Sequence, residues 1–284
     1  MNTFLAAAVQ LNSRPELNKS MELVREGLEQ AIRNHASFIA LPENFAFLGD
    51  EKEKHRQAEK IADTVLDKIP MWAKEHGVYI LAGGFPVRAK SGKVYNRAIM
   101  TNPDGDIIAQ YDKIHLFDIT LSEKDTYRES ALVEAGQPEA VICEISLGGR
   151  PFSNREKGVR DSGACFGLSI CYDVRFPELY RRLTGMGAEV LCIPSAFTRP
   201  TGEAHWGVLL RARAIENSAY VIAPAQTGRH SKKRTTYGHS MIIDPWGKVL
   251  ADSGTEPGIV LAEIDLGYLR EIRQKLPSLQ HRIL

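Results

Sequence analysis

Three side chains that can take part in nucleophilic catalysis each stand at the end of a short apolar run: Glu43, Lys113 and Cys171. A thiol can attack a carbonyl carbon, a carboxylate can carry the proton, and an ammonium can stabilise the oxyanion that forms. Each residue also has an ordinary interpretation, as a surface or capping acid, a solvated lysine or a buried cysteine. The sequence therefore predicts catalysis only if the fold brings the three side chains together.

Cys171 lies where an apolar strand, 164–170, gives way to a turn that leads into a helix. A thiol at a strand end, with a helix N-terminus and Arg175 nearby, is placed where a thiolate is favoured and a substrate can reach it. The stretch from Gly167 to Cys171 resembles a serine nucleophile elbow, but Cys171 replaces its last glycine. Cys171 is therefore a better candidate nucleophile than Ser169.

The position of Glu43 directly after a buried strand favours a general base, because partial desolvation raises the pKa of a carboxyl group. The sequence contains no comparable pattern of residues for binding a metal. Cys143, Cys165 and Cys192 form no Cys-x-x-Cys pair and have no histidine at zinc-ligand spacing, so they are interpreted as buried, reduced thiols. Dinucleotide, Walker-type and His-Glu-x-x-His motifs are also absent from the sequence.

The elements that must position these residues follow from an alternation of short apolar runs with longer amphipathic ones. The predicted strands are 4–11, 37–41, 78–83, 94–101, 107–111, 141–145, 164–170, 190–194, 220–225, 238–244, 249–252 and 259–264. The predicted helices are 18–34, 51–76 with an interruption at Pro70, 177–185 and 203–216. Turns at 102–105 and 245–248 join hairpin-like pairs. This pattern predicts a mixed α/β protein with two sheet-forming halves covered by helices.

Two polar segments are predicted to be loops. Residues 148–163 are rich in glycine and arginine and are interpreted as an exposed loop inserted before the strand that ends at Cys171. The segment from Arg229 to Arg234 is interpreted either as a solvated surface turn or as a basic loop that helps to attract an acidic substrate.

The composition excludes several classes of protein. The chain has 284 residues, and 36 Lys and Arg against 35 Asp and Glu give a formal net charge of +1, which argues against a nucleic-acid partner. The apolar run from Phe4 to Val9 is too short for a secretory signal, and no run approaches the roughly 20 residues of a membrane span. We therefore predict a cytoplasmic protein with no membrane partner.

The segments around Glu43, Lys113 and Cys171 resemble, in their order, the Glu-Lys-Cys signature of the nitrilase superfamily of carbon–nitrogen hydrolases. The resemblance runs from Ala8-Val9-Gln10 to Leu276-Pro277, which is almost the whole chain. It implies an α/β fold of the nitrilase type, a four-layer αββα sandwich, formed by a single carbon–nitrogen hydrolase domain over residues 1–284. It also implies a homodimer with no metal or organic cofactor.

The resemblance further implies a role for each of five residues. Cys171 attacks the amide carbon, and Glu43 takes the thiol proton and donates it to the departing ammonia. Lys113 and the backbone N–H of Tyr172 hold the oxyanion, while Glu129 corresponds to the superfamily's second glutamate and orients Lys113 and the substrate. Water activated by Glu43 then releases the acid from the thioester.

Within the superfamily the chain is most similar to the deaminated glutathione amidases, over the segments 172–179, 204–206, 210–216, 226–230 and 237–241. That similarity implies hydrolysis of deaminated glutathione to 2-oxoglutarate and Cys-Gly, a metabolite-repair activity. The omega-amidases, which act on 2-oxoglutaramate or 2-oxosuccinamate, share the segments around Lys113 and Cys171 and are the alternative. A non-enzymatic interaction scaffold is disfavoured, because it predicts a broken triad.

Arg175, four residues after Cys171, suits bidentate capture of a carboxylate, so the predicted substrate is a small amide that carries a carboxylate. The alternative for Arg175 is a structural ion pair with a residue such as Glu178. Three histidines are either pocket residues or core and loop residues: His205, His230 and His239.

Overall fold

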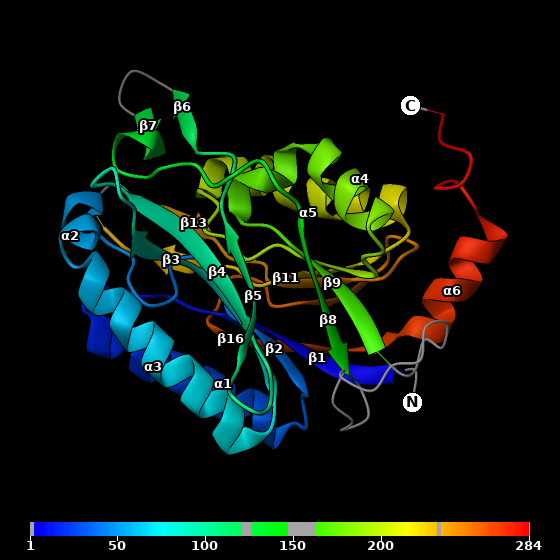
Figure 1. Ribbon diagram of the computed structural model, residues 1–284, viewed down its shortest axis with the longest axis horizontal. Coiled ribbons are helices and arrows are strands. Elements are labelled where there is room, and N and C mark those ends of the chain that lie inside the picture. The colour runs from blue at the N-terminus through cyan, green and yellow to red at the C-terminus, as the bar shows by residue number, and fades with distance from the viewer. Residues whose placement is uncertain (1–2, 121–125, 147–162, 232–233, 284) are drawn as a thin grey trace.

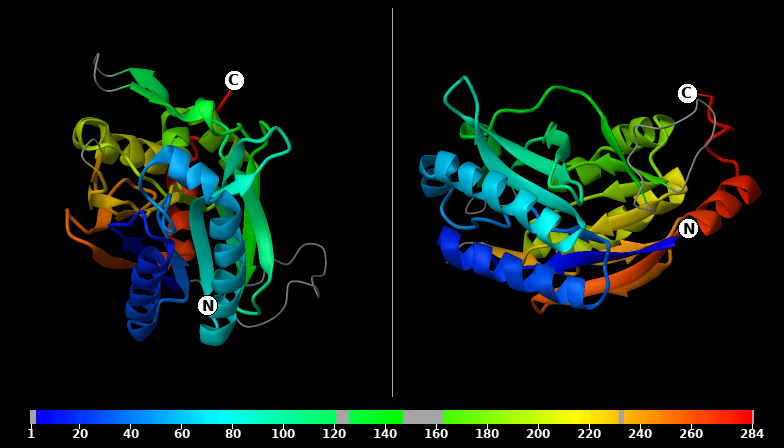
Figure 2. Two further views of the ribbon diagram at one scale, coloured as in Figure 1. Left: turned by 90° about the vertical axis from the view of Figure 1, so that its left-hand side faces the viewer. Right: turned by 60° about the horizontal axis from the view of Figure 1, so that its bottom comes forward.

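The computed structural model describes residues 3–120, 126–146, 163–231 and 234–283. Two six-stranded sheets pack face to face, and helices cover the outer face of each sheet (Figure 1). Views from two further directions show the same order of helix, sheet, sheet and helix (Figure 2). The predicted αββα sandwich is therefore confirmed.

The first sheet combines parallel and antiparallel strands. Its strands in spatial order are β16 (Gly258–Asp265), β1 (Thr3–Gln10), β2 (Phe38–Ala40), β3 (Tyr79–Arg88), β4 (Val94–Thr101) and β5 (Ile107–Asp112). β1, β2 and β3 run parallel, whereas β3, β4 and β5 are successively antiparallel. Because β4 runs opposite to β3 and β5 runs opposite to β4, β5 has the same direction as β2 and ends at the same edge of the sheet.

The second sheet is built in the same way. Its strands in spatial order are β15 (Val249–Asp252), β14 (Met241–Ile243), β11 (Tyr220–Ala223), β10 (Val190–Cys192), β9 (Gly163–Leu168) and β8 (Val141–Ser146). β9, β10 and β11 are parallel and lie at the centre. Buried parallel strands read as continuous apolar runs, which explains why these strands were recognisable in the sequence.

Amphipathic helices form the two outer layers. They are α1 (Leu17–Arg33), α2 (Glu51–Arg56) and α3 (Ala58–His76) beside the first sheet, α4 (Pro177–Gly185) and α5 (Arg199–Asn217) beside the second, and α6 (Leu266–Lys275) after β16. On α1 the residues Met21, Val24 and Leu28 recur on one face and are buried, as the helical period requires. Between the sheets, the Phe38 and Phe166 ring centroids lie 4.6 Å apart, which joins β2 to β9.

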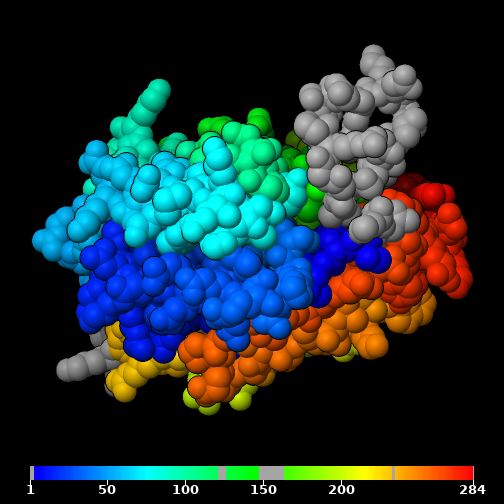
Figure 3. Space-filling model, turned by 90° about the horizontal axis from the view of Figure 1, so that it is seen from below, coloured from blue at the N-terminus to red at the C-terminus, as the bar shows by residue number. Residues whose placement is uncertain are grey.

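The two sheet-forming halves of the sequence do not stay separate. β16, from the C-terminal end, pairs antiparallel with β1 along its whole length. The space-filling view shows this C-terminal segment, in orange, against the N-terminal segment, in blue (Figure 3). The N-terminal sheet is therefore completed by the last strand of the chain.

The predicted interruption at Pro70 is wrong. α3 continues through Pro70 and ends at Gly77, which adopts a left-handed φ of 65°. A proline inside a helix costs about 3 kcal/mol through the lost hydrogen bond and ring clash. Ile69 and Ala73, on either side of Pro70, are both fully buried, and their packing outweighs that cost. The actual break in the predicted helix is at Gln57, between α2 and α3.

The two predicted loops have different outcomes. Of the segment 148–163, all but Gly163 lies outside the described residues. The segment 229–234 begins inside a strand, because Arg229 ends β12 (Thr227–Arg229), which pairs with β13 (Thr235–Tyr237) in a two-stranded ribbon. Lys232 and Lys233 lie outside the described residues. A second ribbon joins β6 (Asp118–Thr120) to β7 (Thr126–Arg128). No helix in the described ranges is long and apolar enough to cross a membrane.

Candidate active site

The three predicted residues meet at one edge of the two sheets. Glu43 follows β2, Lys113 follows β5 and Cys171 follows β9, and all three face the same cavity. The carboxyl ends of parallel strands meet at a common edge, which is where ligands bind in α/β proteins. The exposed fractions of Glu43, Lys113 and Cys171 are 3%, 2% and 7%, so the site is almost fully shielded from bulk water.

A sharp turn holds Cys171 at the cavity. Its backbone has a left-handed φ of 51°, and it begins the short 3-10 helix Cys171–Arg175. Left-handed backbone is strained for a residue with a side chain and costs on the order of 1 kcal/mol or more. The Cys171 N–H donates to the carbonyl of Pro194 at 2.9 Å, and the Ile170 N–H donates to the Asp173 carboxylate at 2.8 Å. These two bonds stabilise the turn.

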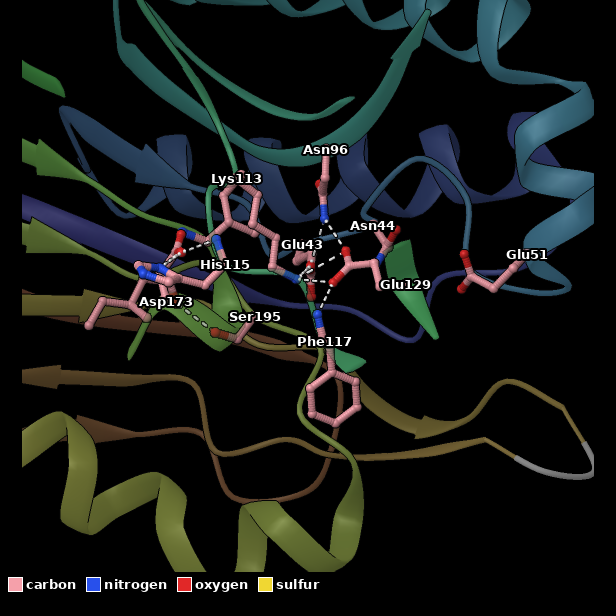
Figure 4. A network of polar contacts seen from close by, with 12 residues as sticks. Glu43, Asn44, Glu51, Asn96, Lys113, His115, Phe117, Glu129, Asp173 and Ser195 are labelled. Atoms are coloured by element: carbon pink, nitrogen blue, oxygen red, sulfur yellow. Dashed lines mark hydrogen bonds and ion pairs between the residues drawn. The ribbon is translucent and has the colours of Figure 1, made fainter. Parts of the chain in front are cut away.

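Lys113 lies between two carboxylates. Its Nζ is 3.2 Å from Glu43 Oε1 and 2.8 Å from Glu129 Oε2. The Cys171 thiol lies close enough to the Glu43 carboxylate for each group to shift the pKa of the other. Asn96 Nδ2 donates to Glu43 Oε1 at 2.9 Å and to Glu129 Oε1 at 3.3 Å (Figure 4). We call Glu43, Lys113, Glu129 and Cys171 the Cys171 cluster.

The electrostatics of the Cys171 cluster fix its resting protonation state. Burial and the nearby Glu43 carboxylate raise the pKa of the Cys171 thiol well above its ordinary value. Burial by itself would raise the pKa of Glu43, but Lys113 and the neighbouring Cys171 thiol lower it. Burial opposes the charge of Lys113, yet Glu129 and Glu43 raise its pKa well above the ordinary value. The resting site therefore holds Cys171 as a thiol, Glu43 as a carboxylate and Lys113 as an ammonium.

Glu129 and Tyr172, the two supporting residues, both line the cavity. Glu129 accepts hydrogen bonds from Lys113 at 2.8 Å and from the Phe117 N–H at 2.6 Å. Glu129 therefore fixes the ammonium and the loop after it. The Tyr172 ring packs edge-on against Phe117, with the centroids 5.1 Å apart, which joins the loop after Cys171 to the loop after Lys113.

Two polar residues of this region were missed by the sequence analysis. Asp173 is fully buried and accepts hydrogen bonds from Tyr111 Oη at 2.7 Å and from the His115 N–H at 3.1 Å, while also accepting from Ile170. It thereby ties the strand that carries Lys113 to the turn that carries Cys171. Asn96, the other, lies inside β4. A Cβ on Gly84 would lie 2.0 Å from Asn96 Oδ1, so glycine is required there.

The cavity has a volume of about 640 Å³. Tyr172 and Phe197 are among its lining residues, whereas Arg175 is not. Arg175 instead lies over the rings of Tyr172 and Phe197, at 5.7 and 5.4 Å from their centroids, and its Nη2 is 3.3 Å from His205 Nδ1. The predicted substrate-binding arginine is thus absent from the cavity lining and contacts two of the aromatic residues that form it.

The histidines left open by the sequence lie outside this lining as well. His230 Nδ1 is 3.0 Å from the Ser13 carbonyl, and burial lowers the pKa of His230 to about 4. His239 Nδ1 contacts the Asp252 carboxylate at 3.0 Å. The described part of the chain contains no group of three His, Cys, Asp or Glu residues that could hold a metal.

A second charged cluster lines the cavity. Glu51, at the start of α2, binds Arg234 Nη1 through Oε1 at 2.6 Å and Lys54 Nζ through Oε2 at 2.6 Å. Lys54 Nζ also donates to Asn44 Oδ1 at 3.0 Å, and Asn44 adjoins Glu43. Figure 4 shows Glu51 set apart from the Lys113 contacts. We call Glu51, Lys54 and Arg234 the Glu51 cluster.

Comparison with known proteins agrees with this arrangement. The family model described as carbon-nitrogen hydrolase matches residues 5–274. The chain belongs to the carbon–nitrogen hydrolase family. It is therefore a hydrolase that acts on amide C–N bonds, as the sequence predicted.

Individual members of the family cover the whole chain. A protein of Synechocystis sp. (strain PCC 6803 / GT-S) named deaminated glutathione amidase is 50% identical over 285 residues, which are 100% of this chain and 99% of that protein. The Homo sapiens protein of the same name is 40% identical over 283 residues, covering 98% of this chain and 82% of that one. The crystal structure of Saccharomyces cerevisiae Nit3, a member of branch 10 of the nitrilase superfamily, matches with a TM-score of 0.81 and 28% identity over 97% of this chain and 95% of that one. The predicted resemblance to the nitrilase superfamily is confirmed.

Proposed function

We propose that this carbon–nitrogen hydrolase cleaves the amide of deaminated glutathione and releases 2-oxoglutarate and Cys-Gly. The choice of this substrate rests on the 50% identity, over the full length of this chain, to a protein named deaminated glutathione amidase. The cavity volume of about 640 Å³ supports a peptide-sized substrate. This function would make the protein a metabolite-repair enzyme.

The proposed mechanism begins with the proton of the Cys171 thiol. Glu43 takes this proton as the sulfur attacks the amide carbon, so a C–S bond forms and the carbonyl electrons move to oxygen. Lys113 Nζ and the Tyr172 backbone N–H stabilise the resulting oxyanion. Glu43 then donates the proton to the nitrogen as the C–N bond breaks. With deaminated glutathione the leaving group is the amine of Cys-Gly instead of the ammonia expected from the sequence.

Deacylation reverses these roles. Water attacks the thioester carbon and gives one proton to Glu43, and the departing Cys171 sulfur recovers that proton when the acid leaves. Glu129 acts as a positioning residue that holds Lys113 through both stages. These steps need no cofactor, and every proton that is transferred begins and ends on a group in the cavity.

Kinetics on matched amides test the substrate. The value of kcat/KM for deaminated glutathione is expected to exceed that for 2-oxoglutaramate, which has the same acyl half but ammonia as the leaving group. A clear preference for 2-oxoglutaramate or 2-oxosuccinamate would reassign the protein as an omega-amidase. Mass spectrometry of the protein quenched during turnover is expected to detect a 2-oxoglutaryl thioester on the peptide that contains Cys171.

The remaining proposals concern the assembly and location of the protein. We propose a cytoplasmic homodimer formed by packing one sandwich on another, with no nucleic-acid or membrane partner. Light scattering during size-exclusion chromatography tests the dimer, and a monomeric mass at micromolar concentration would contradict it.

A further inference from the structure

The Glu51 cluster carries an excess positive charge. Arg234 and Lys54 share one carboxylate, so the three side chains sum to one positive charge at neutral pH. The Lys54 and Arg234 side chains are only 10% and 22% exposed. This excess positive charge would attract an anionic ligand that enters the cavity.

Arg234 also has unused hydrogen-bonding capacity. Its Nη1 is bound to Glu51, but its Nε is buried and has no hydrogen-bond partner among the residues that the structure describes. A buried donor without a partner costs about 1–3 kcal/mol. Arg234 also lines the cavity, so its guanidinium is near a ligand that binds there.

The Glu51 cluster lies near the catalytic base. Lys54 binds Asn44, the residue next to Glu43, and the charge of Arg234 is close enough to Glu43 to lower the pKa of that carboxyl group. In the 2-oxoglutaryl group only three carbon atoms separate the carboxylate carbon from the carbonyl carbon that Cys171 attacks. Lys54 and Arg234 therefore place their positive charge on the side of the cavity near Glu43, the catalytic base.

We infer that Arg234, assisted by Lys54, binds the carboxylate on the acyl half of the substrate and so selects 2-oxo dicarboxylic acid monoamides. This role, which the sequence had given to Arg175, rests on the proposed amidase function. The guanidinium of Arg234 offers a planar pair of donors that matches a carboxylate. Arg175 does not line the cavity, and its guanidinium lies over the rings of Tyr172 and Phe197.

The test compares three amides. Deaminated glutathione carries a carboxylate on each half, 2-oxoglutaramate carries one only on the acyl half, and 4-oxopentanamide replaces that carboxylate with a methyl group. In Arg234→Gln we expect kcat/KM to fall about 10- to 100-fold for the first two amides, because a charge-assisted bond is lost. For 4-oxopentanamide, which has no carboxylate for Arg234 to bind, we expect a change of less than about threefold.

Two further variants keep the result interpretable. Arg234→Lys keeps the charge and loses the paired donors, so it is expected to recover part of the lost kcat/KM. Arg33→Gln removes an exposed arginine of α1, whose side chain is 69% exposed, and is expected to match the wild type. Thermal unfolding of each variant separates lost folding from lost binding.

Three results would overturn the inference. An equal loss on 4-oxopentanamide would mean that Arg234 supports the fold or the chemistry. A loss on deaminated glutathione without one on 2-oxoglutaramate would move the contact to the glycine carboxylate of the leaving half. No loss on any amide would mean that Arg234 does not contact substrate.

A different measurement tests the proposed function. It depends on the wild-type preference for deaminated glutathione over 2-oxoglutaramate, whereas the inference depends on the ratio of variant to wild type on carboxylate and neutral amides. An omega-amidase would therefore disprove the proposed substrate and still give the Arg234→Gln result expected here.

Discussion

The two charged clusters that line the cavity have the same construction with opposite signs. In the Cys171 cluster one ammonium, Lys113, lies between two carboxylates, Glu43 and Glu129. In the Glu51 cluster one carboxylate lies between two cations, Lys54 and Arg234. The first cluster therefore has one negative charge in excess, and the second has one positive charge in excess.

This difference separates chemistry from recognition. When Glu43 takes the thiol proton, the carboxylate charge moves to sulfur and the total charge of the Cys171 cluster stays the same. The protein therefore does not have to accommodate a new buried charge at the moment of attack. The Glu51 cluster has no proton to transfer in this scheme, and its excess positive charge can attract a substrate carboxylate.

Removing the nucleophile is expected to give the largest effect. Cys171→Ala leaves the charges of both clusters unchanged and removes only the atom that forms the thioester. We expect kcat/KM to fall by at least about 10⁴-fold, and the thioester mass to disappear. Binding of 2-oxoglutarate, measured by calorimetry, is expected to persist. A variant with substantial turnover would refute the role of Cys171, and loss of 2-oxoglutarate binding would mean that the clusters are not independent.

Removing the central ammonium is expected to have the next largest effect. In Lys113→Met the buried carboxylates of Glu43 and Glu129 face each other without a cation. Breaking a buried ion pair in this way costs about 3–5 kcal/mol of unfolding free energy, and losing the oxyanion contact lowers kcat about 10²- to 10³-fold.

Chemical denaturation and single-turnover kinetics measure the two consequences of Lys113→Met separately. The double variant Lys113→Met/Glu129→Gln is the control, because it removes one of the two facing charges. It is expected to regain stability but not activity. Wild-type-like turnover in Lys113→Met would exclude Lys113 from oxyanion stabilisation.

Neutralising the positioning carboxylate is expected to have a smaller effect. Glu129→Gln loses the 2.8 Å ion pair to Lys113 but can still accept a bond from the Phe117 N–H. We expect kcat to fall about 10-fold, as for one lost charge-assisted bond, with KM within about twofold. Glu129→Asp keeps the charge and is expected to recover part of kcat. If the loss appeared in KM alone, Glu129 would contact substrate instead of orienting Lys113.

The same comparison explains what the sequence could predict. Glu43, Lys113 and Cys171 each follow a strand, and strands of this kind appear as apolar runs in the sequence. The local pattern and the family motif together were therefore sufficient to select these three residues as candidates. Asp173 and Asn96 gain their importance only from partners 58 and 53 residues away in the chain, His115 and Glu43. No local pattern encodes such contacts.

Arg234 shows the same limit in the Glu51 cluster. In sequence it belongs to a basic segment that resembles a solvated turn, and its partner Glu51 is 183 residues away. The fold shields the arginine and directs it to the cavity. The Pro70 error has the same cause, since tertiary packing of α3 outweighed a local helix-breaking signal.

The smallest expected effect concerns the stability of the Glu51 cluster as a function of pH. Burial opposes the charge of Glu51, but Lys54 and Arg234 lower its pKa from 4.5 to about 2. A carboxyl group whose pKa is lower in the folded state stabilises the protein above its unfolded pKa, and this contribution is lost as the pH falls toward the folded value. Because the Glu51 side chain is 46% exposed, solvent screening limits the contribution to about 1 kcal/mol.

Glu51→Gln is therefore expected to lower the midpoint of thermal unfolding at pH 7 by roughly 2–4 °C. The gap between wild type and variant is expected to narrow as the pH decreases from 4.5 toward 3, because the Glu51 carboxyl group of the unfolded chain then binds a proton while that of the folded protein, with a pKa of about 2, does not. Glu22→Gln, an exposed substitution on α1, is the matched control and is expected to show no such convergence. A difference in unfolding midpoint that stayed constant with pH would mean that Glu51 stabilises the protein through packing. The ionised Glu51 carboxylate would then not stabilise the two cations of its cluster.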